Sequence, residues 1–176
     1  CRRSVTSSRQ AAGCDNARVD TVVRVEGVSD QIALETLSER RRVDLAVVPM
    51  GGAHGIGRFL RRFDGARIVG LCDEREQDVF LRAGMEPGHF HVCVADLEDE
   101  LVHALGAAGV ETVLAAHDDL DAFRVFQNQP AWRGRPVEAQ LRRFLCASDR
   151  RKLRYARFLV EAAADRDCVP RPLDAV

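Results

Sequence analysis

The sequence has no apolar run that approaches the roughly 18 residues of a membrane-spanning helix, which excludes a helical integral membrane protein. The first 18 residues are polar and basic and contain no apolar export segment, so we interpret them as a loose tail. The six cysteines form no C-x-x-C pair, so a zinc knuckle is not expected. Together these absences favour a cytoplasmic protein with reduced thiols.

Lysine is almost absent, because Lys152 is the only lysine among 26 basic residues. A Walker A motif needs a lysine after closely spaced glycines, and no such glycines precede Lys152, so this chain contains no P-loop ATPase. A single lysine either marks a site that needs a compact ammonium group or reflects chance in an arginine-rich composition.

What the sequence does contain is a globular composition, with 46% hydrophobic and 30% charged residues and a net charge of −1. The charges are unevenly distributed. Residues 96–121 hold eight acids and no lysine or arginine, whereas residues 128–160 hold nine bases against two acids. This separation indicates either a polyanionic partner or two solvated helical faces of opposite sign.

Apolar strand patterns alternate with helical patterns in the first half of the chain. Strands are predicted over residues 21–26, 45–50, 66–72 and 89–95, and only helical patterns follow residue 97. The first helix is predicted to start at a cap formed by Ser29 or Asp30. Such an alternation predicts an α/β fold with a Rossmann-like parallel sheet. We expect a tail at 1–19, an α/β core at 20–105, a helical extension with a basic face at 106–168, and a tail at 169–176.

Three of the four predicted strands end on acids, namely Glu26, Asp73 and Asp96. Ligands of open parallel sheets lie outside the carboxyl ends of the strands, so neighbouring strands would bring these carboxylates together. Three further acids shortly after these strand ends, Asp30, Glu76 and Glu98, are expected to face back toward the same edge. A cluster of carboxylates favours Mg²⁺ or Mn²⁺, and the alternative is a set of solvated loop residues.

Four segments in order resemble the TOPRIM domain of nucleases of the OLD (overcoming lysogenization defect) family. They are "VVRVEGVSDQIALETL", "IVGLCDERE", "VADLEDELVHALG" and "RRKLRYARFLVE". The resemblance covers about residues 20–165. The sequence most resembles small actinobacterial proteins described as ATP-dependent endonucleases or TOPRIM nucleotidyl transferase/hydrolase domain proteins.

The resemblance implies a TOPRIM fold and Mg²⁺-dependent cleavage of DNA phosphodiester bonds by a two-metal-type mechanism. By motif, Glu26 would be a metal ligand and general base, and Lys152 would stabilise charge on the phosphate. The other implied metal ligands or their close supports are Asp30, Asp73, Asp96 and Glu98. The usual second motif is Asp-x-Asp, but Arg75 stands in the place of the second acid. Either Glu74 or Glu76 substitutes for that acid, or one metal site is weakened.

Contacts to phosphate or nucleic acid are predicted for two groups of residues. Gly51 and Gly52 open a glycine-rich turn whose amides could cradle a phosphate. The basic helix near the C-terminus would hold the DNA backbone through Arg150, Arg151 and Arg154. OLD proteins also carry an ATPase domain, so the resemblance leaves open a separate ATPase as a partner.

Three alternatives remain open at this stage. The first is a TOPRIM scaffold, weakened at Arg75, that binds nucleic acid or a partner ATPase. The second is a nucleotide-binding Rossmann module built on the Gly51–Gly57 turn, although the Tyr-x-x-x-Lys pair of short-chain dehydrogenases is absent. The third is a soft-metal site on the strand that carries His89, His91 and Cys93.

Overall fold

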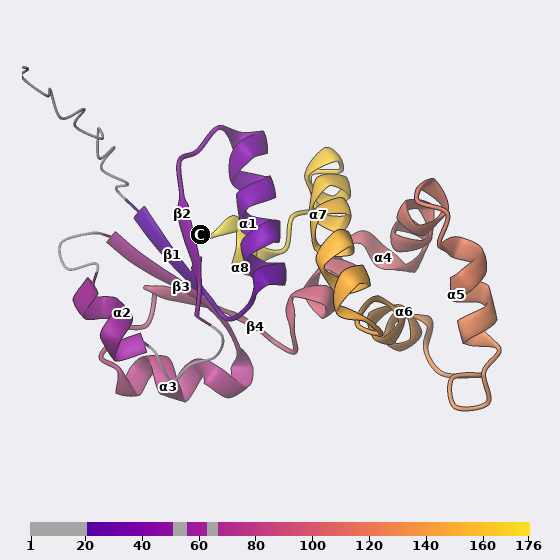
Figure 1. The fold of residues 1–176 in the computed structure, drawn as a ribbon, viewed down its shortest axis with the longest axis horizontal. Helices are drawn as coiled ribbons and strands as arrows, with labels where there is room; N and C mark the ends of the chain where they lie inside the picture. The colour runs from indigo at the N-terminus through magenta and orange to yellow at the C-terminus, as the bar shows by residue number, and fades with distance from the viewer. Residues whose placement is uncertain (1–20, 51–55, 63–66) are drawn as a thin grey trace, which may run out of the picture.

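Four parallel strands form the sheet of the computed structural model, which describes residues 21–50, 56–62 and 67–176. The strands are β1 (Thr21–Val25), β2 (Ala46–Pro49), β3 (Arg67–Asp73) and β4 (Phe90–Cys93), in the order β2-β1-β3-β4 (Figure 1). All four predicted strands are confirmed, with ends that differ by one or two residues. Because β1, β3 and β4 are neighbours, the three acids at or just after the ends of these strands reach the same edge of the sheet.

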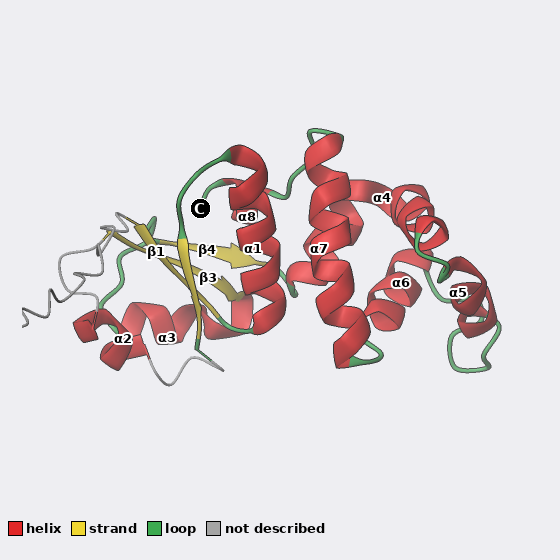
Figure 2. Ribbon diagram, turned by 45° about the horizontal axis from the view of Figure 1, so that its top comes forward, coloured by secondary structure: helices red, strands yellow, loops and turns green. Residues whose placement is uncertain are grey.

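Both faces of the sheet are covered, which explains why its strands are nearly continuous apolar runs. Val23 and Val25 of β1 pack on one face against α1 (Val28–Arg41), and the more distant helices extend this core. The opposite face packs against α2 (Ile56–Arg62) and α3 (Gln77–Arg82), with Phe80 at its centre (Figure 2). The sheet therefore lies in the middle of an α/β/α sandwich, as the sequence predicts.

The second half of the described chain is helical. Its elements are α4 (Leu97–Ala116), α5 (Leu120–Gln127), α6 (Val137–Leu145), α7 (Asp149–Asp165) and α8 (Arg171–Asp174). Helix α4 is interrupted at Gly106, whose φ of 67° and ψ of 162° are not helical. The domain boundary predicted between residues 105 and 106 stays a prediction. Helix α7 then returns to pack beside α1, between the sheet and α6 (Figure 1).

The end of the chain differs from its prediction as a tail. Residues 171–174 form α8, and Leu173 is only 1% exposed because it packs into the core beside α1. An ion pair joins Arg41 at the end of α1 to Asp174. The tail predicted at 1–19 and the glycines at 51 and 52 lie outside the described residues. Within the described ranges, no helix combines the length and apolarity needed to cross a membrane.

Candidate metal centre

A pocket of about 320 Å³ opens at the carboxyl ends of β1, β3 and β4. It gathers residues from strands that are far apart in the sequence and from α7. Six of the predicted site residues line it: Glu26, Asp30, Asp73, Asp96, Glu98 and Lys152. The topology thus brings together five carboxylates and one ammonium group within one cavity.

The end of β1 and the start of α1 supply the first wall of this pocket. Glu26 is exposed, and Gly27 in an extended conformation caps α1, rather than Ser29 or Asp30 as predicted. Asp30 lies in the first turn and accepts a 2.9 Å hydrogen bond from the Gly27 amide at Oδ2. Burial raises the pKa of Asp30 to about 6, although this amide bond opposes the shift.

The end of β3 supplies a second wall. Asp73 caps a short 3₁₀ helix, η2 (Glu74–Glu76), by accepting a 3.0 Å hydrogen bond from the Glu76 amide. Both Glu74 and Arg75 are exposed, and neither lines the pocket. Glu76 does not line it either, although burial and then the charge of Glu26 raise the pKa of its carboxyl. Of the second acidic motif, only Asp73 reaches the cavity.

The third wall comes from the segment after β4. Asp96 caps α4 by accepting a 2.8 Å hydrogen bond from the Asp99 amide at Oδ1. Its second oxygen receives the guanidinium of Arg142 from α6, at 2.9 Å from Nε and 2.5 Å from Nη2. This partner was not predicted, since nothing local in the sequence links residue 142 to residue 96. Asp96 is therefore engaged at both oxygens.

Glu98 is the most buried acid of the centre, with 2% of its surface exposed. Within the described residues, neither of its oxygens accepts a hydrogen bond, and its one ionic partner is Lys152, with Nζ at 3.4 Å. Burial raises the pKa of Glu98 to about 7, against the effect of the ammonium group. Burial alone would lower the pKa of Lys152, but the surrounding negative charges hold it above its usual value.

A sulfur atom also belongs to this region. The carboxylates of Asp96 and Glu98 and the thiol of Cys146 place their ligand atoms within 4.8 Å of one another. No sequence motif marks Cys146, which directly follows α6, so it was not among the predicted site residues. Burial and the nearby carboxylates raise the pKa of this thiol to about 11. Three donors so close together, with no hydrogen bond to Glu98, are the arrangement of side chains that a divalent cation would stabilise.

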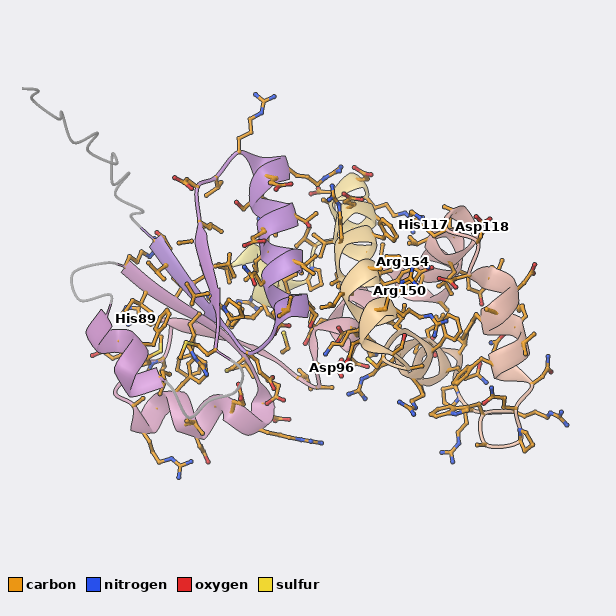
Figure 3. All side chains as sticks on the ribbon, viewed as in Figure 1. His89, Asp96, His117, Asp118, Arg150 and Arg154 are labelled. Atoms are coloured by element: carbon orange, nitrogen blue, oxygen red, sulfur yellow. The ribbon has the colours of Figure 1, made fainter. Side chains whose placement is uncertain are left out.

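The alternative soft-metal set is not assembled in the described part of the chain. Its three residues provide no group of close metal donors, and only Cys93 lines the pocket. Figure 3 shows His89 beside α2, at the end of the sheet opposite Asp96. Burial lowers the pKa of His91, whose ring lies against the Ala175 backbone.

The three arginines predicted to hold nucleic acid lie together at the start of α7. Arg150, Arg151 and Arg154 line a separate pocket of about 270 Å³ with Asp119. Figure 3 shows Arg150 and Arg154 on the side of α7 that faces His117. Arg154 forms an ion pair with Asp119, and Tyr155 donates a 2.8 Å hydrogen bond to the same carboxylate. Only Arg150 has no ionic partner among the described residues.

The uneven charges of the sequence therefore have a partly internal explanation. Acids of the 96–121 segment pair with bases of the 128–160 segment in the contacts Asp96–Arg142, Asp99–Arg142, Glu98–Lys152, Asp119–Arg151 and Asp119–Arg154. These pairs fasten α6 and α7 to the two ends of α4. Neither of the two interpretations offered by the sequence, a polyanionic partner or two solvated faces, included such internal pairing.

No protein-family model matches the sequence, and no curated protein matches it either. Solved structures do match. The C-terminal region of the Burkholderia pseudomallei OLD protein superimposes with a TM-score of 0.59 at 16% identity, over 90% of this chain and 95% of that one. The platinum-phased C-terminal region of the Xanthomonas campestris pv. campestris OLD protein gives a TM-score of 0.59 at 20% identity, over 89% of each chain. This chain therefore has the α/β TOPRIM fold, with a helical extension, of the C-terminal regions of OLD proteins.

Proposed function

We propose that this protein is a Mg²⁺- or Mn²⁺-dependent nuclease that cleaves or nicks DNA phosphodiester bonds. One observation carries the proposal: Glu98, 2% exposed and without a hydrogen bond to either oxygen among the described residues, lies in a pocket with four other carboxylates. Lys152 pairs with Glu98 and Arg142 pairs with Asp96, so the carboxylates around the pocket still outnumber these bases, and a divalent cation would neutralise the remaining negative charge. The shared fold with OLD C-terminal regions supports the choice of a nuclease.

The donor set fits hard divalent cations. Asp30 and Asp73 each use one carboxylate oxygen for a local cap, and in the described ranges the other oxygen accepts no hydrogen bond. These oxygens, with Glu26 and Glu98, are the ligands that Mg²⁺ and Mn²⁺ prefer. A divalent cation held by these oxygens would supply Lewis-acid activation of a water molecule and stabilisation of the leaving oxygen of a phosphodiester.

The residues of the chain would then divide the remaining work. Glu26, exposed at the mouth of the pocket, accepts the proton of the attacking water as general base. The Lys152 ammonium stabilises the charge that develops on the phosphate. Arg150 contacts the DNA backbone outside the pocket. Arg151 and Arg154 add further contacts to it, although both also pair with Asp119, which offsets part of their charge. The cleavage would show little sequence specificity, because these contacts reach phosphates and not bases. A separate ATPase remains a second proposed partner.

The direct test is incubation of supercoiled plasmid with the protein in Mg²⁺ or Mn²⁺. Conversion to the nicked or linear form is expected with added metal, and EDTA is expected to stop it. Nicking that continues in EDTA would point to another enzyme in the preparation. If the plasmid stays supercoiled with both metals, the nuclease proposal is wrong.

Metal binding is expected to release protons, because burial raises the pKa values of Glu98 and Asp30 to about 7 and about 6. Near pH 6 the pocket should release roughly one to two protons per loaded centre, and almost none above pH 8. The raised pKa of Glu98 also makes the stability of the metal-free protein depend on pH. This protein should lose stability as the pH rises from the ordinary pKa of a glutamate side chain to the raised pKa of about 7, because the folded state binds the Glu98 proton more tightly than the unfolded state does.

Isothermal titration calorimetry in buffers of different ionisation enthalpy measures this release. Glu98→Gln should remove most of it, and Glu100→Gln serves as the control on the same helix. Equal proton release at pH 6 and pH 8.5 would contradict the role of Glu98.

A scaffold without catalysis is the second candidate, and two observations favour it. Exposed Arg75 stands where a second acid is expected, so β3 contributes only Asp73 to the pocket. Arg142 also holds Asp96, which would have to be released to bind an ion. The plasmid test separates this scaffold from the nuclease.

A further inference from the structure

Beside the metal centre lies a wider groove of about 900 Å³, between the start of α4, the start of α6 and the turn that joins α5 to α6. It shares Asp96 with the metal centre, so the two cavities meet at this residue. Its other notable side chains are Trp132, Arg135, Arg142 and Arg143. The size of the groove is in the range of pockets that hold organic ligands.

We propose that this groove binds unpaired nucleotides of a DNA strand, with a base stacked on Trp132 and phosphates held by Arg135 and Arg143. The inference rests on the proposed function for the nature of the ligand. It adds a preference for single-stranded segments next to the site of cleavage, which the metal centre itself does not provide.

Trp132 is held as a ready platform for stacking. Its ring lies against that of Phe126, with centroids 5.3 Å apart and planes inclined by 28°. Gln140, which is buried, donates a 2.7 Å hydrogen bond from Nε2 to the Trp132 carbonyl. The side-chain oxygen of Gln140 in turn accepts a 2.7 Å bond from Gln127. Trp132 is nevertheless only half-buried, because one side of it lines the groove. An aromatic ring fixed on one face and open on the other suits a nucleic-acid base, which presents a flat π-face whatever its sequence.

The charged side chains of the groove divide into a paired set and an unpaired set. At the end near the metal centre, Asp96 and Asp99 pair with Arg142, with closest contacts of 2.5 and 4.0 Å. Two other arginines of the groove, Arg135 before α6 and Arg143 on α6, are exposed and have no ionic partner in the described part of the chain. The one acid there that forms no ion pair with a described residue is Glu138. Apart from the ion-paired residues, the groove thus carries an excess of one positive charge in addition to the aromatic ring, which suits the phosphates and bases of a strand.

Trp132 is the only tryptophan of the sequence, so its fluorescence reports on the groove alone. Titration with a single-stranded oligonucleotide in EDTA, where no cleavage occurs, should quench this fluorescence. A blunt duplex of the same sequence should quench it far less, and inorganic polyphosphate, which has charge but no bases, should not quench it. Quenching that is equal for duplex and single strand, or absent for both, would overturn the proposal.

Anisotropy of a labelled single strand gives the second measurement. Trp132→Ala should weaken its binding about 5- to 150-fold, the loss expected for one stacked base. Trp132→Phe keeps an aromatic ring against Phe126 and should retain most of the affinity, which separates a loss of stacking from a misfolded turn. The pair Arg135→Ala and Arg143→Ala should lower the salt slope by about 1.4.

Arg157→Ala, on the exposed face of α7, is the matched control and should change nothing. An affinity that is unchanged in Trp132→Ala would contradict the stacking. These binding results stand apart from cleavage. If the protein binds the single strand but never nicks plasmid, the proposed role of the groove stands and the proposed nuclease activity is wrong. If it nicks plasmid but does not bind the single strand, only the proposed nuclease activity stands.

Discussion

Replacing Glu26 by glutamine is expected to slow metal-dependent cleavage by about 10²- to 10⁴-fold, the range that a positioned general base contributes. Glutamine has the same size but cannot accept the proton of water and is a poorer metal ligand. Glu26 is exposed and follows the last residue of β1, so the substitution disturbs no packing. Single-turnover conversion of supercoiled plasmid measures the rate.

The matched control is Glu35→Gln. Glu35 is exposed on α1 and accepts a 2.8 Å hydrogen bond from Gln31, which glutamine can also accept. Cleavage by this variant should equal that of the unmodified protein. If the Glu26→Gln variant retains more than about a tenth of the cleavage rate, Glu26 is not the general base. Calorimetry with Mn²⁺ then shows whether the metal affinity changed.

Replacing Lys152 by methionine is expected to lower the rate by about 10²- to 10³-fold, as the loss of a single charge-stabilising donor does. Its Nζ lies 3.4 Å from Glu98, at the wall of the pocket. The same change removes the ionic partner of the buried Glu98, so the metal-free protein should also lose stability at pH 8, where this carboxyl is mostly charged in the unmodified protein.

Two further variants separate catalysis from stability. Lys152→Arg should keep the stability but recover little of the rate, because a planar guanidinium does not reproduce a compact ammonium group. The double variant Lys152→Met with Glu98→Gln removes both charges and should restore the melting temperature at pH 8 without restoring cleavage. Recovery of the full rate in Lys152→Arg would mean that only the positive charge matters.

The sheet could be predicted from the sequence because each strand is a run of apolar residues bounded by polar ones. The period and the length of such runs are local properties. One residue of β1 did not fit the pattern. Arg24 is fully buried, and its guanidinium lies 4.1 Å from the centre of the Phe80 ring on the α3 face. The sequence alone does not reveal which aromatic ring packs against a charged side chain in a central strand.

The candidate site was predictable only as far as strand ends determine it. Parallel pairing of β1, β3 and β4 was enough to bring Glu26, Asp73 and Asp96 to one edge. The contributions of Arg142 and Cys146 depend on how α6 packs against α4, which is a long-range property of the fold. The burial of Leu173 could not be predicted either, because it depends on long-range packing and a short Pro-flanked segment carries no helical period.

The return of α7 to the side of α1 has a consequence for biosynthesis. During translation the carboxylates of the pocket, from Glu26 to Glu98, emerge before Lys152 and the arginines that pair with α4. Domains generally fold as they emerge. A nascent chain that holds only β1 to α4 would lack the lysine that neutralises Glu98 and the guanidinium that restrains Asp96. The centre is therefore complete only after α7 has docked, and a product truncated before α6 would carry the carboxylates without Lys152 and Arg142.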